Sequence, residues 1–280
     1  ENMPLIRQKL TARALLLTTL AAGLALATGA AYAGRQCETA KPTPQVIERG
    51  MALAQRTATA LDAAYAQDGT RVVLLARAGQ DLTKYGQTWS HVGWAYRTPQ
   101  GVWRVVHKLN QCGSDRSMVT RQGLGEFFLD DLWRYQATWR AAPRAWQDAL
   151  WQLLQDNGRA LTLHQPRYSI VSYAWGTRYQ QSNQWAIETL ALAAEPGLRQ
   201  RAQAQAWLKL KDYQPATLRI GPLARLGGRV GSANVAFDDH PDAQRFANQI
   251  QTVTADSVLS WLDRLDAAAR PTAAAGMIKI

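Results

Sequence analysis

The stretch Ser90–Cys112, SHVGWAYRTPQGVWRVVHKLNQC, decides the fold. Residues 91–97 alternate between large apolar and other side chains, and residues 102–106 resume a β-branched and aromatic pattern, which is typical of strands. The tetrapeptide 98–101, TPQG, separates the two runs. Because proline lacks an N–H donor and glycine adopts turn conformations, this tetrapeptide predicts a turn. The stretch therefore predicts two antiparallel strands joined in a hairpin.

A histidine stands at each end of this hairpin. His91 opens the first strand and His107 closes the second. In an antiparallel pair the start of one strand lies beside the end of the next. We therefore expect the two imidazoles to be neighbours in space. Two unrelated histidines on a half-buried hairpin would fit the composition equally well, since histidine is moderately common in cores.

The hairpin resembles part of a known enzyme superfamily. The run SHVGWAYR, followed by VVH, is similar to the histidine strand and the next strand of papain-like peptidases of the NlpC type. The resemblance implies that His91 is a catalytic base and that His107 orients it. Trp94 departs from the pattern, because an aliphatic residue is usual there, and the match covers only about a tenth of the chain.

A second segment, YQQSNQW at 179–185, leads into an apolar helix expected at 183–194. It resembles the "NCxxF/W…E" segment of the circularly permuted branch of that superfamily, which includes lecithin-retinol-acyltransferase-like proteins. In that branch the two polar strands come first and the nucleophile helix later, as in this chain. The resemblance places Gln181 at the Asn position, Ser182 at the Cys position, Trp185 at the aromatic position and Glu188 at the acid position.

Ser182 departs from the family pattern, whose nucleophile is a cysteine. A hydroxyl has a much higher pKa than a thiol, so it would need full general-base activation by histidine. Backbone N–H groups at the helix start would then hold an oxyanion. Ser182 also suits the N-cap of a helix that begins at Asn183. Nucleophile, helix cap and inert relic of a lost cysteine all remain open.

The N-terminal segment, residues 1–33, has the pattern of an export signal. It carries three basic residues near its start, an apolar stretch at 14–27 and the small-x-small sequence Ala31-Tyr32-Ala33. This pattern predicts cleavage between Ala33 and Gly34 and release into the periplasm or beyond. The apolar stretch is shorter than the roughly 20 residues that span a bilayer, and we expect no transmembrane segment in the mature chain.

The chain is strongly basic, with a formal net charge of +11. Residues 1–33 contribute three basic groups and one acidic group, so the mature charge is 11 − 2 = +9. Such a charge attracts anionic envelope components, either peptidoglycan carboxylates or lipid phosphates. Nucleic acid is the other usual partner of a basic protein, and export argues against it. Charge that serves solubility alone is an equal alternative.

The chain has two cysteines, Cys37 and Cys112. In an oxidising compartment an even number of cysteines indicates a disulfide, and two buried thiols are the alternative. Neither a CxxC motif nor a zinc-type Cys/His spacing occurs in the sequence, so we predict no metal site and no cofactor.

The rest of the chain predicts one α+β domain over 34–270, followed by a disordered tail at 271–280. The pattern favours helices at 44–67, 143–157, 183–194, 198–210 and 257–269, strands at 71–78 and 135–140, and a polar loop at 113–121. Glycines at 221, 227, 228 and 231 interrupt a segment of short apolar pieces, and GGRVG lacks the lysine of a phosphate loop.

The resemblance implies a permuted papain-like core, in which a central antiparallel sheet carries the two histidines and packs against helix 183–194. It further implies an exported amide hydrolase or acyltransferase acting on a peptidoglycan-type or lipid substrate. In that interpretation Ser182 attacks, His91 removes its proton and His107 orients His91. The alternative is a catalytically inactive binding protein on the same scaffold.

Overall fold

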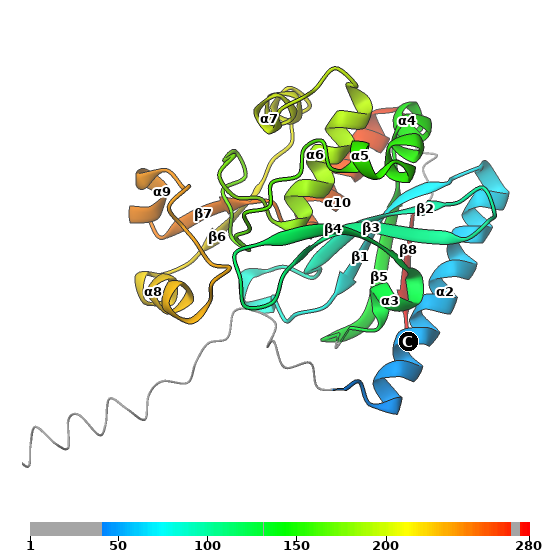
Figure 1. Cartoon of the computed structure of the whole chain (residues 1–280), viewed down its shortest axis with the longest axis horizontal. Helices are drawn as coiled ribbons and strands as arrows, with labels where there is room; N and C mark the ends of the chain where they lie inside the picture. The colour runs from blue at the N-terminus through cyan, green and yellow to red at the C-terminus, as the bar shows by residue number, and fades with distance from the viewer. Residues whose placement is uncertain (1–40, 131, 270–274) are drawn as a thin grey trace, which may run out of the picture.

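A computed structural model of the chain describes residues 41–130, 132–269 and 275–280 (Figure 1). Its centre is a six-stranded antiparallel sheet with the order β4-β3-β2-β1-β5-β8. The strands are β1 Val72–Ala78, β2 His91–Arg97, β3 Trp103–Asn110, β4 Ser117–Gly123, β5 Arg134–Ala141 and β8 Ala275–Lys279. The α+β class and the antiparallel sheet packed against helices are as predicted.

Helices cover both faces of this sheet. One face carries α4 (Arg144–Gln155), α6 (Ser182–Ala194) and α10 (Ala255–Ala269), and α2 (Pro44–Asp68) and α3 (Leu124–Phe128) pack on the other. Two short elements, α5 (Asn157–Ala160) and the 3-10 turn η1 (Thr83–Tyr85), lie in connections, and α7 (Arg201–Leu210) packs on α6.

The alternation of side chains along the strands produces two separate cores. Leu74, Trp94 and Val106 belong to the core beneath α6, whereas Val73 and Val105 belong to the core beneath α2 and α3. All seven residues of β1 are buried, which confirms that this strand is covered on both faces. On β1, β2 and β3, even-numbered residues therefore face α6, and odd-numbered residues face α2 and α3.

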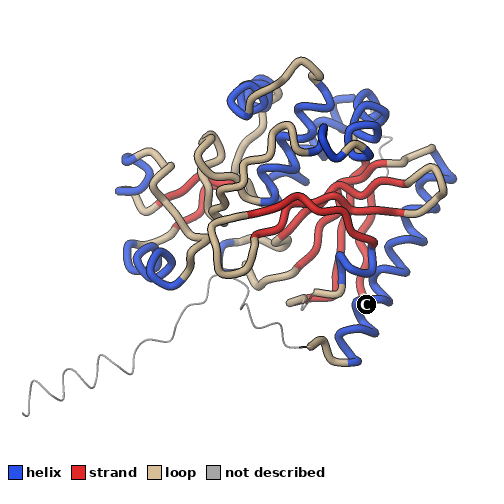
Figure 2. Tube along the Cα trace, in the orientation of Figure 1, coloured by secondary structure: helices blue, strands red, loops and turns tan. Residues whose placement is uncertain are grey.

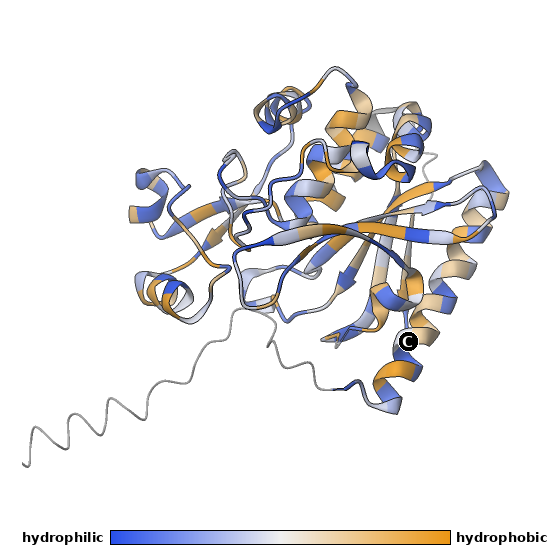
Figure 3. Cartoon of the chain, in the orientation of Figure 1, coloured by the Kyte–Doolittle hydropathy of each residue, from blue (hydrophilic) through white to orange (hydrophobic). Residues whose placement is uncertain are grey.

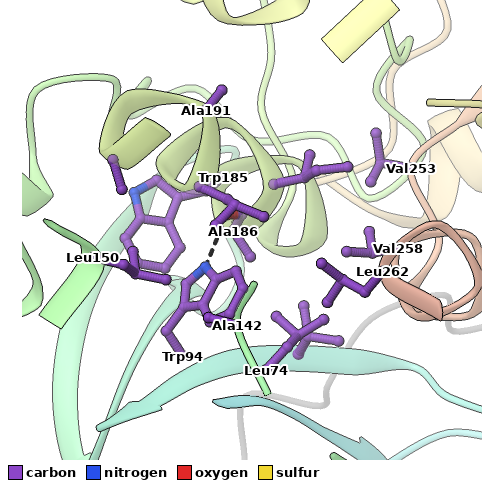
Figure 4. Packing of buried hydrophobic residues seen from close by; sticks show 14 of the residues in the cluster. Leu74, Trp94, Ala142, Leu150, Trp185, Ala186, Ala191, Val253, Val258 and Leu262 are labelled. Atoms are coloured by element: carbon purple, nitrogen blue, oxygen red, sulfur yellow. Dashed lines mark hydrogen bonds between the residues drawn. The ribbon is translucent and has the colours of Figure 1, made fainter. Parts of the chain in front are cut away.

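The structure shows why a tryptophan, Trp94, stands where the papain-like pattern has an aliphatic residue. Its fully buried indole lies between β2 and α6, and its Nε1 donates a hydrogen bond of 2.8 Å to the carbonyl of Ala186 (Figure 4). Burying an indole requires a partner for its N–H, and a backbone carbonyl of α6 supplies one. The tryptophan thus fixes the distance between the helix and the sheet.

A smaller unit lies at one side of the sheet (Figure 2). It contains the two-stranded sheet of β6 (Ala216–Arg219) and β7 (Gln249–Thr252), together with α8 (Pro222–Gly231) and α9 (Asp242–Phe246). Its apolar cluster consists of Ile220, Val235, Phe237 and Ile250. The glycine-rich segment thus contains a helix, α8, that the sequence did not predict.

Two further segments differ from the prediction. The polar segment expected as a loop at 113–121 contributes most of β4, an edge strand that pairs with β3. Residues 275–279, expected within a disordered tail, form β8 beside β5. Each strand pairs with the backbone N–H and C=O groups that its neighbour, β3 or β5, would otherwise leave unpaired. This pairing depends on the neighbouring strand, so the hydrophobicity of the segment itself does not reveal it.

The predicted export signal and Cys37 lie outside the described residues. Cys112 follows β3, and its pairing with Cys37 stays a prediction. Among the described helices, none is both long enough and apolar enough to cross a bilayer.

Candidate functional site

The hairpin brings the two histidines together. β2 and β3 pair antiparallel with Trp94 opposite Val106 and Arg97 opposite Trp103, and Gly101 in the turn has φ of 82°. His91 Nε2 lies 2.8 Å from His107 Nδ1. The prediction that the two imidazoles are neighbours is therefore confirmed.

A glutamine extends this pair into a chain of hydrogen bonds. His107 Nε2 lies 2.8 Å from Gln122 Oε1 on β4. An amide oxygen only accepts, so His107 donates from Nε2 and, when neutral, accepts at Nδ1. His91 must then donate from its own Nε2. Gln122 thus sets the tautomers of both imidazoles, although no motif in the sequence pointed to it.

Burial keeps His107 uncharged. Its side chain is 1% exposed and packs edge-on against Phe127 of α3, with ring centroids 5.2 Å apart. Burial lowers the pKa of His107 from 6.5 to about 3, and the positive charge of Arg77 contributes. Arg77 is held in place by an ion pair with Asp130. At neutral pH His107 therefore serves as a fixed, neutral acceptor for His91.

Gly93 makes room for this arrangement. A Cβ at Gly93 would lie 2.6 Å from Val105 Cγ1 and 3.0 Å from His107 Cβ. Real Cβ atoms do not approach other atoms this closely, so the neighbouring strand would have to shift. The glycine of the "HVG" pattern thus has a packing reason in this chain.

Ser182 is the first residue of α6, and its side chain is buried. Its Oγ lies 3.4 Å from the hydroxyl of Tyr168, and the residue is 5% exposed. The helix cap is Gln181, whose Oε1 accepts a hydrogen bond of 2.7 Å from the N–H of Asn183. The interpretation of Ser182 as the N-cap is therefore wrong, because the longer Gln181 side chain satisfies that N–H.

Two other residues at the start of α6, Asn183 and Trp185, hold the helix in place. Asn183 Oδ1 accepts a hydrogen bond of 3.1 Å from the N–H of Val92, which ties α6 to the start of β2. Trp185 is fully buried, and its Nε1 lies 3.3 Å from the carbonyl of Ala160. Both residues therefore have structural contacts that account for their presence.

Ser182 belongs to a helix that packs on the other face of the sheet from the imidazole pair. α6 packs on the face that carries Val92 and Trp94, whereas His91 and His107 contact Phe127 on the opposite face. We expected the three side chains to converge in one cleft, and the structure brings together only the two histidines. The physical reason is the alternation of side chains along β2 and β3. His91 and His107 are odd-numbered like Val105, and they therefore lie on the face that α2 and α3 cover.

Glu188 lies at the centre of a buried polar network on the α6 face. Arg201 of α7 donates to it through Nε at 2.7 Å and through Nη2 at 3.0 Å. Gln180 and Gln205 donate to it at 2.6 Å and 2.9 Å. The carboxylate, which is fully buried, therefore accepts four hydrogen bonds, as a buried charge requires.

Lys108 joins the same network and was not selected from the sequence. Its Nζ lies 2.6 Å from the carbonyl of Gln165, 2.8 Å from Gln180 Oε1 and 3.4 Å from His164 Nδ1. Burial lowers the pKa of Lys108 to about 6, and burial lowers that of His164 to about 4. A neutral amine would donate to the two oxygens. The position of Lys108 one residue after His107 could have indicated that it points to the other face.

The described residues include no group of three or more His, Cys, Asp or Glu side chains placed to hold a metal ion. The candidate site consists of two polar systems. The His91–His107–Gln122 chain lies on the α3 face, and the Glu188–Arg201–Lys108 network lies on the α6 face.

One family model matches the chain. It is described as "Uncharacterized protein conserved in bacteria (DUF2145)" and covers residues 64–262, from the end of α2 to within α10. No curated protein and no solved structure matches the chain at a significant level. The matched range contains both polar systems and the unit formed by β6, β7, α8 and α9.

Proposed function

The chain belongs to the DUF2145 family of bacterial proteins, and we propose that it is an exported envelope protein that binds its ligand without cleaving it. The proposal includes a permuted papain-like scaffold that has lost its thiol. The observation that carries it is the state of the α6 N-terminus. Ser182 is buried against Tyr168, and the N–H of Asn183 is already bound by Gln181.

This state opposes nucleophilic catalysis for two reasons. An attacking hydroxyl needs a base within hydrogen-bonding reach, and His91 and His107 project from the opposite face of the sheet. An oxyanion needs N–H donors that are available to it, and the Gln181 side chain occupies one of those at the helix start. Both requirements would demand a rearrangement of α6 against β2.

The net charge supports the ligand class. The mature chain would carry 11 − 2 = +9 charges, which favours an anionic envelope component over a neutral one. Peptidoglycan carboxylates and lipid phosphates both meet this description. The proposed location follows from the signal-like pattern of residues 1–33.

A second candidate is the amide hydrolase or acyltransferase in which Ser182 attacks. The observation in its favour is the hydrogen-bonded chain of His91, His107 and Gln122, which would orient an imidazole base. This candidate requires Ser182 to leave Tyr168 and reach His91 around the end of β2.

Labelling separates the two candidates. Protein recovered from the periplasm is treated with a fluorophosphonate probe, with Ser182→Ala and His91→Ala as controls. We expect no labelling of the wild type above the level of Ser182→Ala. Labelling that both substitutions abolish would overturn the binding proposal in favour of the hydrolase.

Binding is measured in parallel by sedimentation with purified peptidoglycan and with lipid vesicles. We expect association with at least one anionic component, weakened by salt. Absence of binding to both would contradict the proposal. Mass analysis of the recovered protein should also show an N-terminus at Gly34, and an intact N-terminus would argue against export.

A further inference from the structure

The helix α8 exposes a continuous apolar face. Leu223, Leu226 and Val230 are spaced so that they share one side of the helix, and they are 85%, 61% and 82% exposed. Phe246 of the adjacent α9 is 82% exposed. Gly228 faces the other way, since a Cβ there would lie 3.1 Å from Val235. The apolar side of α8 therefore points away from the protein.

Arginines surround this apolar face. A hollow of about 210 Å³ is lined by Arg225, Arg229 and Arg245 together with Leu226, Phe237 and Phe246. Arg225 is braced by the carbonyl of Arg245 and, at 3.1 Å, by Asn248 Oδ1. The hollow thus combines positive charge with apolar walls, and hydrophobic and hydrophilic bands alternate on α8 (Figure 3).

The positive charge of this region is largely uncompensated. No acidic side chain of the described residues forms an ion pair with Arg219, Arg225 or Arg229. Arg245 alone pairs with an acid, Asp242 at 2.9 Å. An isologous contact between two copies would bring these arginines against one another, so the charge disfavours a second copy as the occupant.

We infer that the α8–α9 face, formed by Leu223, Leu226, Arg229, Val230, Arg245 and Phe246, docks onto the anionic lipids of a membrane surface. The four apolar side chains enter the interface between headgroups and acyl chains, and the arginines bind lipid phosphates. Exposed apolar residues flanked by arginines are the features by which a surface helix binds a bilayer. The inference deepens the proposed function, on which it rests for the envelope location.

Vesicle binding tests this inference. The mature protein, recovered from the periplasm, is floated with phosphatidylcholine vesicles that contain or lack phosphatidylglycerol. We expect binding only to the vesicles with phosphatidylglycerol, and a decrease of binding as salt increases. A wild type that binds neither composition, or both equally well, overturns the inference.

Surface variants locate the contact. Leu223→Ser/Val230→Ser should weaken binding about tenfold or more, because two exposed apolar side chains no longer enter the bilayer. Arg229→Gln should weaken it by about fivefold. The matched controls are Leu210→Ser, whose leucine is 77% exposed on α7, and Arg264→Gln, whose arginine is exposed on α10. Both controls should bind like the wild type.

The outcomes distinguish this inference from the proposed function. Variants on the α8–α9 face that remain folded by circular dichroism and still bind vesicles like the wild type overturn it. A concentration-dependent dimer that Leu223→Ser/Val230→Ser abolishes, without vesicle binding by the wild type, overturns it in favour of a second copy. Peptidoglycan binding without vesicle binding would leave the proposed function standing and the membrane contact refuted.

Discussion

The adjacent residues His107 and Lys108 of β3 are both buried, and their side chains enter opposite faces of the sheet. His107 is held by Gln122, and Lys108 is held by Gln180. Burial is the main cause of the lowered pKa of each side chain. One strand thus carries two basic groups that are uncharged or nearly so at neutral pH, each part of a different polar system.

His107 should remain neutral until strongly acidic pH. Its pKa is lowered from 6.5 to about 3, so the unfolded chain binds a proton in this range and the folded chain does not. Stability that is complete above pH 6.5 should therefore be lost as pH falls toward 3, by up to about 1.4 kcal/mol per pH unit from this group. NMR of the imidazole nitrogens, assigned with His107→Asn, measures the titration directly. A midpoint near 6.5 for His107 would refute the assignment.

Lys108 should make the stability rise with pH. Its pKa is lowered from 10.5 to about 6, so between these values the unfolded chain binds more protons than the folded chain. The free energy of unfolding should then increase by up to about 1.4 kcal/mol per pH unit from pH 6 toward 10. Lys108→Met should flatten this slope in urea unfolding series.

The matched control for that substitution is Lys84→Met, because Lys84 is exposed. It should leave the slope of the wild type unchanged. If Lys108→Met and Lys84→Met give the same pH dependence, Lys108 is charged in the folded protein and the interpretation of a neutral amine is wrong.

Gly93→Ala should disturb the imidazole pair. The new methyl group would meet Val105 Cγ1 at 2.6 Å and His107 Cβ at 3.0 Å, which forces β2 and β3 apart. We expect a loss of roughly 1–3 kcal/mol in the free energy of unfolding and a shift of the His107 imidazole resonances. Gly197→Ala is the control, because nothing lies within 4 Å of its added Cβ. An equal effect of the two substitutions would contradict the packing argument.

The hairpin could be predicted from the sequence because its signals are local. Alternation, a Pro-Gly turn and the two histidines all lie within residues 90–112, and the His91–His107 contact follows from antiparallel pairing alone. The helix at 183–194 was predicted for a similar reason, since residues 185–194 are apolar except for Glu188 and Thr189.

The parts that were missed depend on partners distant in sequence. β4 and β8 are polar or small edge strands that are defined by the strand beside them, and α8 carries glycines that weaken its local helical signal. The position of Ser182 relative to the histidines depends on which face of the sheet α6 covers. The resemblance of two short segments to a known family suggests the histidines and the serine of a site, but it does not determine which face of the sheet α6 covers.

Glu188 and Arg201 provide the sharpest test of the α6 network. Their ion pair is almost fully buried, with side chains 0% and 8% exposed, and Glu188 also accepts hydrogen bonds from Gln180 and Gln205. Glu188→Gln would leave the Arg201 charge buried without its counter-charge, which should cost about 3–5 kcal/mol of stability in urea unfolding.

The control is Asp148→Asn, since Asp148 is 82% exposed in its 2.6 Å pair with Arg71 and should contribute less than about 1 kcal/mol. The double variant Glu188→Gln/Arg201→Met removes the stranded charge and should be less destabilised than the sum of its single variants. Additive losses, or similar losses for Glu188→Gln and Asp148→Asn, would show that the buried network does not hold α7 against α6.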